Sequence, residues 1–501
     1  MSRSLLLRRV RRVDLDGSGG TAPPVDLLII DGAITEIGPE LSRPSGVDEV
    51  DGEARWAVPG LWDAHVHVAQ WVRTERMLPL GTARRAEDVL AAVAGAVGKQ
   101  PSGRTLLGFG YRPAGWPRAT TVAELDAVSR GRPVVLVSGD AHTGWVNSAA
   151  FDLLAAPRRT GPVSENEWFD LLRRLDELPG AAPEPSDFVA PLARLAALGV
   201  TGLVDFEFEN SFVDWPQRFA AGADSVRVRA STYPHQLDQV IERGLRTGDA
   251  LDGCAGMVTM GPLKIISDGS LGSRTAWTTE PYADRPAGPE PCCGQANYSP
   301  GELRELLQRA TGAGLQVALH AIGDRANTVA IDAFEATGAC GSIEHAQLIA
   351  AHDVRRLGRL GLRASVQPAH LIDDRDLTDR LWGERAASAF PLRTMVAEGV
   401  DVRFGSDAPV AALDPWLAIA TAVHRSGDER PGWHPEQSLN PREALAASVD
   451  SRRLVPGSVG DVVLLDRDPL AEGDNPADTA AALRTMRAAL TVCAGRITHH
   501  G

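Results

Sequence analysis

The sequence predicts an α/β protein with three parts: a TIM-like (β/α)8 barrel, a small β-sandwich domain built from both termini, and an inserted subdomain after the first barrel strand. Both ends of the chain carry short strand patterns, and the middle alternates apolar runs with helical patterns such as GELRELLQRATGAG. Eight of the apolar runs end in polar residues. Alternating strands and helices are typical of a parallel sheet or barrel, and eight strands are the number that a closed barrel needs.

The two ends of the chain lack helical periodicity. LLLRRVRRVD, DLLIIDGAITEIG and DGEARWAVPG follow one another at the start, and GDVVLLDRDP and LTVCAGRITHHG stand at the end. Such runs, bounded by Gly, Asp and Pro, are typical of strands and turns. We therefore expect residues 1–58 and 456–501 to form one composite β-sandwich domain.

The middle of the chain, residues 59–455, carries the predicted barrel domain. Barrel strands deliver functional side chains at their C-terminal ends, which is where the polar residues of these runs stand. The predicted strands are LWDAHVHV (61–68), GVTGLVDF (199–206), SVRVRASTY (225–233), PLKIISD (262–268), LQVALHAIGD (315–324), GSIEHAQ (341–347), RASVQP (363–368) and VRFGSDAP (402–409).

A long interval separates the first and second predicted barrel strands. It contains two further strand-like runs, TLLGFGY (105–111) and PVVLVSGD (133–140). We interpret residues 72–190 as an inserted subdomain that covers one mouth of the barrel.

Composition narrows the function classes. The chain has 501 residues, of which 44% are hydrophobic and 23% charged, and no run approaches the ~18 apolar residues of a membrane helix. Leu5 to Leu7 are too short a run for a signal sequence, and five cysteines without a CxxC pair fit a reducing compartment. A cytoplasmic location is expected.

The net charge of −14 disfavours binding to nucleic acid or to a membrane. The expected partner is therefore a small molecule. Assembly of the chain into a homodimer stays open.

Lysine is rare in this sequence. Lys99 and Lys264 are the only lysines among 51 Lys and Arg residues, so arginine normally supplies the cationic charge. A buried lysine can lose its proton and become a nucleophile, whereas arginine stays charged. Lys264 lies in the apolar run GPLKIISDGS, where it is either such an amine or a lysine that pairs with a neighbour such as Asp268.

Four of the twelve histidines stand at the ends of predicted barrel strands. His65 and His67 are separated by one residue, so both side chains leave the first strand on the same side. His320 and His345 stand toward the ends of the fifth and sixth strands. Each of them alone is more often a core histidine.

Asp407 and Lys264 occupy comparable positions. Asp407 follows the eighth strand in FGSDAP, where alone it could cap a turn, and Lys264 lies in the fourth strand. Coincidence is a poor explanation for six such residues at one end of one barrel. Nitrogen and oxygen donors without thiolate suit Zn²⁺ or another divalent transition metal.

Six motifs in order closely resemble the amidohydrolase superfamily. They are HVH, LKIISDGSLGSRTA, HAIGDRA, IEHAQ, SVQP and GSDAPV. The similarity is greatest to the amidohydrolase family 3 branch, which includes N-substituted formamide deformylases, and it extends from PGLWDAHVH to GDVVLLDRDP.

The resemblance implies a binuclear metal centre. In that superfamily CO₂ carboxylates the lysine of the fourth strand, and the resulting carbamate bridges two metal ions. On this sequence that role falls on Lys264, and the implied cofactors are two divalent ions, with zinc expected, and the carbamate. The other implied ligands are His65, His67 and Asp407 for the more buried ion, and His320 and His345 for the second.

The implied function is hydrolysis of an amide-type C–N bond, other than a peptide bond, in an N-acyl or N-formyl amine. Metal-activated hydroxide would attack, and Asp407 would carry the proton to the leaving nitrogen. Two alternatives stay open. A mononuclear deaminase would have a glutamate where this chain has Asp324 and would lack Lys264, and a non-catalytic scaffold would have lost ligands that are all present here.

Two further stretches supply candidate substrate contacts. In the inserted segment, DAHTGWVNSAAF places His142, Trp145 and Asn147 either in the pocket or in an internal packing and turn motif. Asp268 and Arg274, in the DGSLGSR loop, either contact substrate or order the loop.

Overall fold

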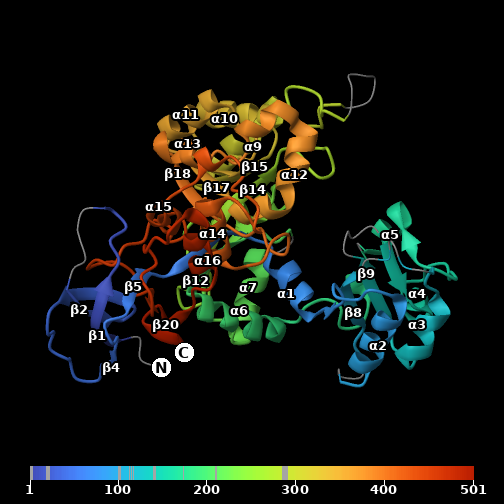
Figure 1. Ribbon diagram of the computed structural model, residues 1–501, viewed down its shortest axis with the longest axis horizontal. Helices are drawn as coiled ribbons and strands as arrows, with labels where there is room; N and C mark the ends of the chain where they lie inside the picture. Colours follow the sequence, from blue (N-terminus) through green and yellow to red (C-terminus); the bar gives the residue numbers. More distant parts are fainter. Residues whose placement is uncertain are drawn as a thin grey trace. The chain divides into compact units, whose positions relative to one another are not determined.

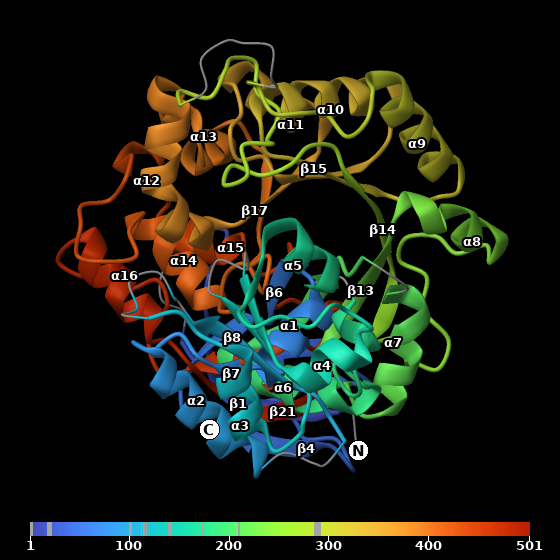
Figure 2. The same cartoon turned by 90° about the vertical axis from the view of Figure 1, so that its right-hand side faces the viewer.

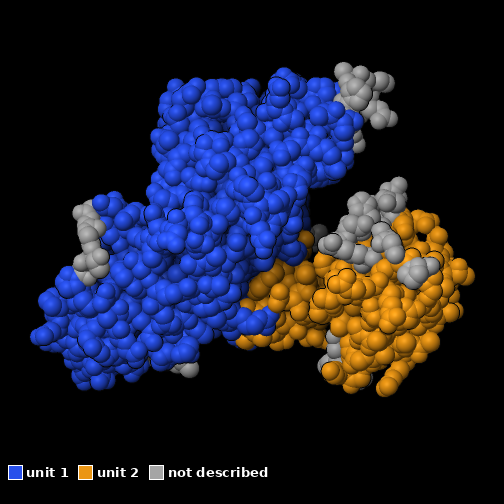
Figure 3. All heavy atoms as spheres, viewed as in Figure 1, with its two compact units in different colours: residues 1–68, 192–501 blue, residues 69–191 orange. Residues whose placement is uncertain are grey.

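The chain divides into two compact units (Figure 3). They comprise residues 1–68 with 192–501, and residues 69–191. The computed structural model describes residues 4–17, 23–99, 103–111, 113, 116, 118–138, 143–172, 174–208, 211–284 and 292–501.

The first unit is built around eight parallel strands, and the predicted fold class is confirmed. The strands pair in chain order, and the first and last are joined where the backbone N–H of Asp407 donates to the His65 carbonyl at 2.7 Å. The strands are β6 (Leu61–Val66), β12 (Val200–Asp205), β13 (Arg227–Thr232), β14 (Val258–Ile266), β15 (Val317–Ala321), β16 (Gly341–His345), β17 (Arg363–Val366) and β18 (Asp401–Phe404).

Strand β14 begins earlier than its sequence pattern indicates. Its first residues, Val258 to Met260, pair with Val228 to Ala230 of β13, and the register then shifts before Leu263 pairs with Thr232. The shift leaves Pro262 at an irregular point of the ladder, which is where proline is tolerated in a strand because it has no N–H to donate. The Gly-Pro pair therefore marks an irregularity within the strand and not its start.

Helices surround the barrel strands (Figure 2). The start of α9 illustrates their sequence signals: the Ser299 hydroxyl accepts the N–H of Glu302 at 3.3 Å, and the Glu302 carboxylate accepts the N–H of Ser299 at 2.7 Å. The helices are α6 (Val189–Leu195), α7 (Ser211–Ala220), α8 (Leu237–Glu242), α9 (Pro300–Gly312), α10 (Asp324–Thr337), α11 (Ala351–Leu360), α12 (Leu371–Trp382), α13 (Leu392–Ala397), α14 (Pro415–His424), α15 (Pro441–Ala446) and α16 (Pro476–Arg484).

A second sheet joins strands from both ends of the chain (Figure 1). Its order is β21-β20-β19-β5-β1-β2-β3, with β4 also paired to β1. Strand β1 changes partners at Arg9, whose φ is 51°, and its two halves enclose an apolar core with Leu7, Val462 and Val492. The strands are β1 (Leu5–Arg12), β2 (Val25–Ile30), β3 (Ala33–Gly38), β4 (Asp48–Asp51), β5 (Trp56–Pro59), β19 (Val462–Leu465), β20 (Ala488–Cys493) and β21 (Arg496–His500).

Residues 69–191 contain a separate five-stranded sheet of order β11-β10-β9-β8-β7. Both predicted strand runs are present as β8 and β9, and three shorter strands extend the sheet. The elements are β7 (Leu78–Pro79), β8 (Leu106–Tyr111), β9 (Val134–Ser138), β10 (Thr143–Val146) and β11 (Val163–Ser164), with helices α1 (Val68–Arg76), α2 (Ala86–Val97), α3 (Val122–Ser129), α4 (Ser148–Leu153) and α5 (Glu165–Leu172).

Among the described residues, no helix combines the length and the apolar character that crossing a bilayer requires. All five cysteines are free thiols.

Candidate metal centre

The six predicted ligands stand at one end of the barrel. His65 is the fifth residue of β6, His320 the fourth of β15 and His345 the last of β16. Lys264 is the seventh of the nine residues of β14, and His67 and Asp407 follow β6 and β18. All six therefore belong to the C-terminal ends of the strands, where barrel enzymes place their reactive groups.

His65 is held in one orientation by Glu344. The Nδ1 atom of His65 lies 2.7 Å from Oε2 of Glu344, and both side chains are 1% exposed. Although burial opposes ionisation of Glu344, the hydrogen bond from His65 outweighs it and lowers the pKa of that carboxyl to about 2. An ionised carboxylate can only accept, so Nδ1 carries the proton and the lone pair of Nε2 faces the site. Burial, reinforced by Lys264, lowers the pKa of His65 to about 4, which keeps the imidazole neutral as a metal ligand must be.

The side chains of three histidines lie close to the carboxylate of Asp407. Its Oδ1 lies 3.5 Å from Nε2 of His65 and 3.4 Å from Nε2 of His67, and its Oδ2 lies 3.8 Å from Nε2 of His370. Burial opposes ionisation of Asp407, but the surrounding histidines, His65 first, hold the pKa of the carboxyl well below its usual range. Asp407 is thus an anion buried among imidazoles.

The backbone around Asp407 is unusually constrained. Asp407 and His345 both have positive φ, 56° and 71°, a region that non-glycine residues adopt at a cost of roughly 1–3 kcal/mol. Two residues before Asp407, a Cβ on Gly405 would lie 2.7 Å from the backbone nitrogen of His65. Only glycine allows this approach, which brings the end of β18 against β6.

The donor set fits a divalent metal ion. One ligand atom from each of His65, His345 and Asp407 lies within 4.8 Å of the others. Nδ1 of His67 and of His345 are buried and, among the residues that the structure describes, have no hydrogen-bond partner. The rings of His320 and His345 are 4.5 Å apart between centroids. Buried imidazoles and a carboxylate that converge without satisfying one another are what a metal ion would complete.

Lys264 lies beside His65 of this group. Its Nζ is 3.1 Å from Nε2 of His65 and 4.2 Å from the centroid of the Phe206 ring. Within the described part of the chain, no carboxylate lies at ion-pair distance from it. Burial lowers the pKa of Lys264 to about 8, so a substantial share of the amine is neutral slightly above neutral pH.

An aromatic pocket of about 380 Å³ adjoins His67. The ring of Phe208 stacks on His67 at 5.0 Å between centroids and lies 5.4 Å from the ring of Tyr233. The Tyr233 hydroxyl donates to the Phe206 carbonyl at 2.8 Å, so its ring is fixed in the wall. The pocket is lined by Phe208, Tyr233, Pro234, His235, Ile266 and Tyr298.

Comparison with known proteins decides the family. The profile of the amidohydrolase family matches residues 48–499. The chain belongs to the amidohydrolase family. It is therefore a hydrolase of a metal-dependent, amidohydrolase-type family.

Curated relatives cover most of the chain. The putative amidohydrolase YtcJ of Bacillus subtilis is 28% identical over 444 residues, covering 83% of this chain and 82% of its own length. The protein LONG AFTER FAR-RED 3 of Arabidopsis thaliana is 27% identical over 481 residues (84% and 79%). The N-substituted formamide deformylase of Arthrobacter pascens is 23% identical over 520 residues (92% of both chains).

A solved structure shares the amidohydrolase architecture. An uncharacterized metal-dependent hydrolase of Pyrococcus furiosus superposes with a TM-score of 0.80 at 26% identity, covering 93% of this chain and all of its own.

Asp268 and Arg274 of this amidohydrolase are engaged in ordering its loops. Asp268 is fully buried and accepts the N–H groups of Trp277, Ile322 and Gly323 at 2.9, 3.1 and 2.9 Å. Its Oδ1 also lies 3.0 Å from Nδ1 of His320.

Arg274 points to a carboxylate of its own loop. Its Nε and Nη2 donate to Oδ2 of Asp284 at 2.9 and 2.7 Å. These contacts favour loop ordering over substrate contact.

Trp145 and Asn147 pack inside the unit of residues 69–191. Trp145 is fully buried, and its Nε1 donates to the Thr121 carbonyl at 2.9 Å. Asn147 caps α4 by accepting the N–H of Ala150 at 3.1 Å, and its amide donates to the Arg132 carbonyl at 2.8 Å. The contacts of both residues favour the packing and turn motif, and His142 lies outside the described residues.

Three residues of the candidate metal centre were not predicted from the sequence. Glu344 orients His65, and Asp63 accepts the N–H groups of His65 and Ser406 at 3.0 and 2.9 Å. His370 follows β17, and its Nε2 is buried without a hydrogen-bond partner among the described residues. The available signal was similar to that for the ligands: His370 is a polar residue two positions after the strand motif SVQP.

Proposed function

We propose that this amidohydrolase hydrolyses the amide-type C–N bond of an N-acyl or N-formyl amine at a centre of two divalent metal ions, with zinc expected. The observation that carries the proposal is the convergence of buried imidazoles, Asp407 and Lys264 at one end of the barrel. The similarity to a relative named N-substituted formamide deformylase supports an amide substrate.

We assign the residues to two ligand groups that Lys264 would bridge. His65, His67 and Asp407 would hold one ion, and His320 and His345 the other. Two ions held there would lower the pKa of a water molecule to about 7 and polarise the substrate carbonyl.

Lys264 is suited to become a carbamate. Its amine is buried, faces His65 and has a pKa lowered to about 8, so the neutral form that reacts with CO₂ is accessible. The reaction forms a bond between Nζ and carbon and releases one proton. The product is an anion with two oxygen atoms in place of a neutral amine, and carboxylate-type oxygen atoms are metal ligands.

Asp407 is placed to move the proton of the reaction. The attacking water loses a proton as it adds to the carbonyl, and the amine leaves only if its nitrogen gains one. Asp407 is an anion in the resting site, so it can accept the first proton and donate it to the nitrogen. His65 cannot take this part, because Glu344 binds one nitrogen and the other faces the ligand group.

The pocket beside His67 favours a substrate with a flat apolar group. Phe208, Tyr233 and Tyr298 supply aromatic faces, and the volume of about 380 Å³ accommodates a ring such as a phenyl or benzyl group.

The proposal is tested by metal analysis together with an activity screen. Protein purified without added metal is expected to contain about two ions per chain and to cleave N-formyl or N-acyl amines, the aromatic ones best. Chelation should abolish turnover, and zinc should restore it. One ion per chain with release of ammonia from an aminated ring would support a mononuclear deaminase instead, and a protein without metal or activity would overturn the proposal.

A further inference from the structure

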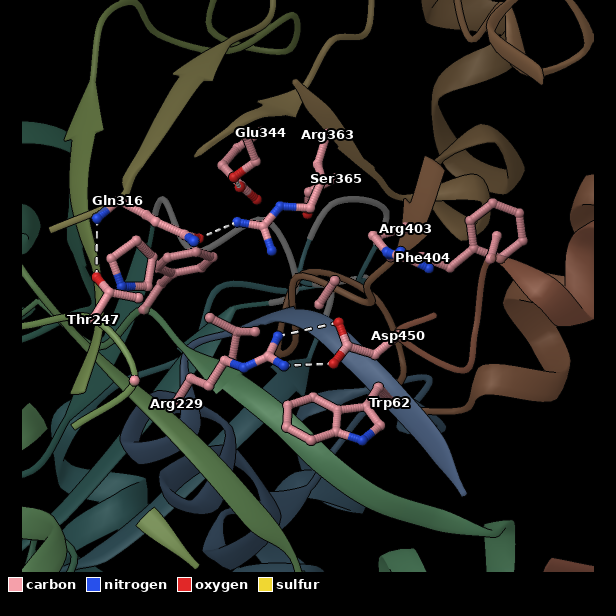
Figure 4. A pocket seen from close by; sticks show the side chains of 17 residues that line it. Trp62, Arg229, Thr247, Gln316, Glu344, Arg363, Ser365, Arg403, Phe404 and Asp450 are labelled. Atoms are coloured by element: carbon pink, nitrogen blue, oxygen red, sulfur yellow. Dashed lines mark hydrogen bonds and ion pairs between the residues drawn. The ribbon is translucent and has the colours of Figure 1, made fainter. Parts of the chain in front are cut away.

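A second cavity lies inside the barrel, at the end where the strands begin (Figure 4). Its volume is about 260 Å³. It is lined by early strand residues, including Trp62 of β6, Arg229 of β13, Arg363 of β17 and Arg403 of β18. Glu344 reaches it from β16 and also binds His65, so this carboxylate stands between the cavity and the candidate metal centre.

The charged groups around the cavity are not all paired. Three guanidinium groups, of Arg229, Arg363 and Arg403, face two carboxylates, of Asp450 and Glu344. Asp401, which pairs with Arg403 from outside the lining, makes the charges equal in number, but Arg363 still has no carboxylate of the described chain at ion-pair distance. A buried charge without a partner is costly, so the cavity favours a bound anion with a single negative charge.

Both carboxylates are engaged by other groups. Asp450 accepts two hydrogen bonds from Arg229, the longer at 3.1 Å. Glu344 is held by His65 at 2.7 Å and by the Ser342 hydroxyl, which donates to Oε1 at 2.5 Å. Neither is left to pair with Arg363.

Arg363 is the cation of this group that has no ion pair. Its Nη2 donates to the neutral amide oxygen of Gln316 at 2.5 Å, and no carboxylate of the described chain lies within the 4.0 Å of an ion pair. Burial lowers the pKa of Arg363, and the nearby charge of Arg229 lowers it further. Ser365, two residues along the same strand and so on the same face, has a buried hydroxyl without a hydrogen-bond partner among the described residues.

Arg403 differs from Arg363 because it already forms an ion pair with a carboxylate. Its Nη2 lies 2.5 Å from Oδ1 of Asp401 and also contacts Ser451. The free edge of a guanidinium group, as at Arg363, matches two oxygen atoms of one planar group.

We propose that this cavity is a binding site for a small planar monoanion, a carboxylate or bicarbonate, held by the guanidinium group of Arg363. The site lies apart from the metal ligands and does not depend on the amide substrate. Free organic acids and dissolved CO₂ are the two sources of such an anion, and they share the chemistry that Arg363 recognises.

The test uses the full-length, metal-loaded protein and three variants. Thermal stabilisation and calorimetric titration with sodium formate, acetate and bicarbonate are compared with chloride at equal ionic strength. Arg363→Gln and Ser365→Ala remove a charged and a neutral donor, and Arg355→Gln, at an exposed position of α11, is the matched control.

The wild type and Arg355→Gln should bind at least one planar monoanion in a saturable way. Arg363→Gln should weaken that binding roughly 10-fold or more, because charged hydrogen bonds are lost, and Ser365→Ala should weaken it less. Binding of bicarbonate alone would assign the site to dissolved CO₂, and binding of formate and acetate would assign it to organic acids.

Two results would overturn the proposal. One is equal anion binding by Arg363→Gln and the wild type, or none beyond chloride. The other comes from crystals of the wild type soaked in formate, which do not depend on any variant folding: density confined to the metal centre, with none at Arg363, would show that the anion belongs there.

Discussion

Glu344 Oε2 and His65 Nδ1 are 2.7 Å apart, and both side chains are buried. Glu344 thereby fixes which nitrogen of His65 faces Lys264 and Asp407. The carboxylate acts through the imidazole and not on the substrate, so we regard Glu344 as a positioning residue.

Replacing Glu344 with glutamine should loosen His65. A neutral amide can either donate or accept, so it no longer dictates the tautomer of the imidazole. We expect Glu344→Gln to lower metal affinity roughly 10- to 100-fold and to reduce kcat more than it changes KM. Glu305→Gln, at an exposed position of α9, is the control. Metal titration and steady-state kinetics check this, and unchanged metal affinity would show that His65 orients without Glu344.

The barrel could be predicted because its eight strands each combine an apolar run with a polar end. The short strands of the second unit could not. Leu78–Pro79 and Val163–Ser164 are two residues long, and so short a run shows no periodicity. They are strands only because longer neighbours supply hydrogen-bond partners.

The site was less fully predictable than the barrel. Glu344 and His345 are adjacent, and alternation along a strand sends neighbours to opposite faces. The positive φ of His345, 71°, breaks that alternation at the strand end, so both side chains serve one site. His370 lies in a short 3₁₀ turn (Pro368–His370), where no period indicates its direction.

Substitutions of Lys264 test whether a carbamate on this residue bridges two metal ions. Lys264→Arg retains a cation but cannot form a carbamate, and Lys264→Ala leaves a space where the amine stood. Both variants should bind less metal and lose most activity, while Lys99→Ala, at an exposed lysine, should not. Short carboxylic acids should partly restore the activity of Lys264→Ala, because they can occupy the space that the side chain left. They should not restore the activity of Lys264→Arg. Metal analysis and turnover measure the outcome, and a fully active Lys264→Arg enzyme would contradict the carbamate.

Asp407→Asn separates proton transfer from ligation. Asparagine keeps the shape and one acceptor oxygen but takes up no proton, so at least one metal ion should remain while amide turnover falls by ~10²-fold or more. The loss should be greatest for basic amine leaving groups and smallest for activated esters, which leave without protonation. Equal losses for amides and activated esters, with metal content intact, would leave Asp407 without a role in proton transfer.

Asp26 of β2 gives a pH dependence that is independent of the metal centre. Burial opposes its ionisation, but the N–H of Arg9 at 3.0 Å, the guanidinium of Arg8 at 2.6 Å and the N–H of Leu41 at 2.9 Å outweigh it and lower the pKa of Asp26. A folded-state pKa below the unfolded value of about 3.9 stabilises the fold above that pH. The contribution is lost as pH falls through the folded-state value.

Asp26→Asn should therefore lower the free energy of unfolding by about 1–3 kcal/mol at pH 7. The difference between wild type and variant should shrink as the pH is lowered from about 4, where the carboxyl of the unfolded chain becomes protonated, through the lower folded-state pKa. Urea unfolding followed across this range measures it. A difference that stays constant with pH would mean that the charge of Asp26 contributes nothing.

Phe208 tests the substrate class. Its ring stacks on His67 and is 42% exposed, so it presents a free face to the pocket that it lines with Tyr233. Phe208→Ala should raise KM for aromatic N-acyl amines by roughly 5- to 10-fold, since a stacked aromatic pair contributes about 0.5–1.5 kcal/mol beyond its buried area. Metal content and the KM of small aliphatic amides should stay near wild type, and Phe208→Tyr should retain aromatic binding. Ile241→Ala removes another exposed apolar side chain, on α8, outside the lining of this pocket, and is the control. If Phe208→Ala raised KM equally for aromatic and aliphatic amides, the ring would be supporting His67 and not recognising a flat group.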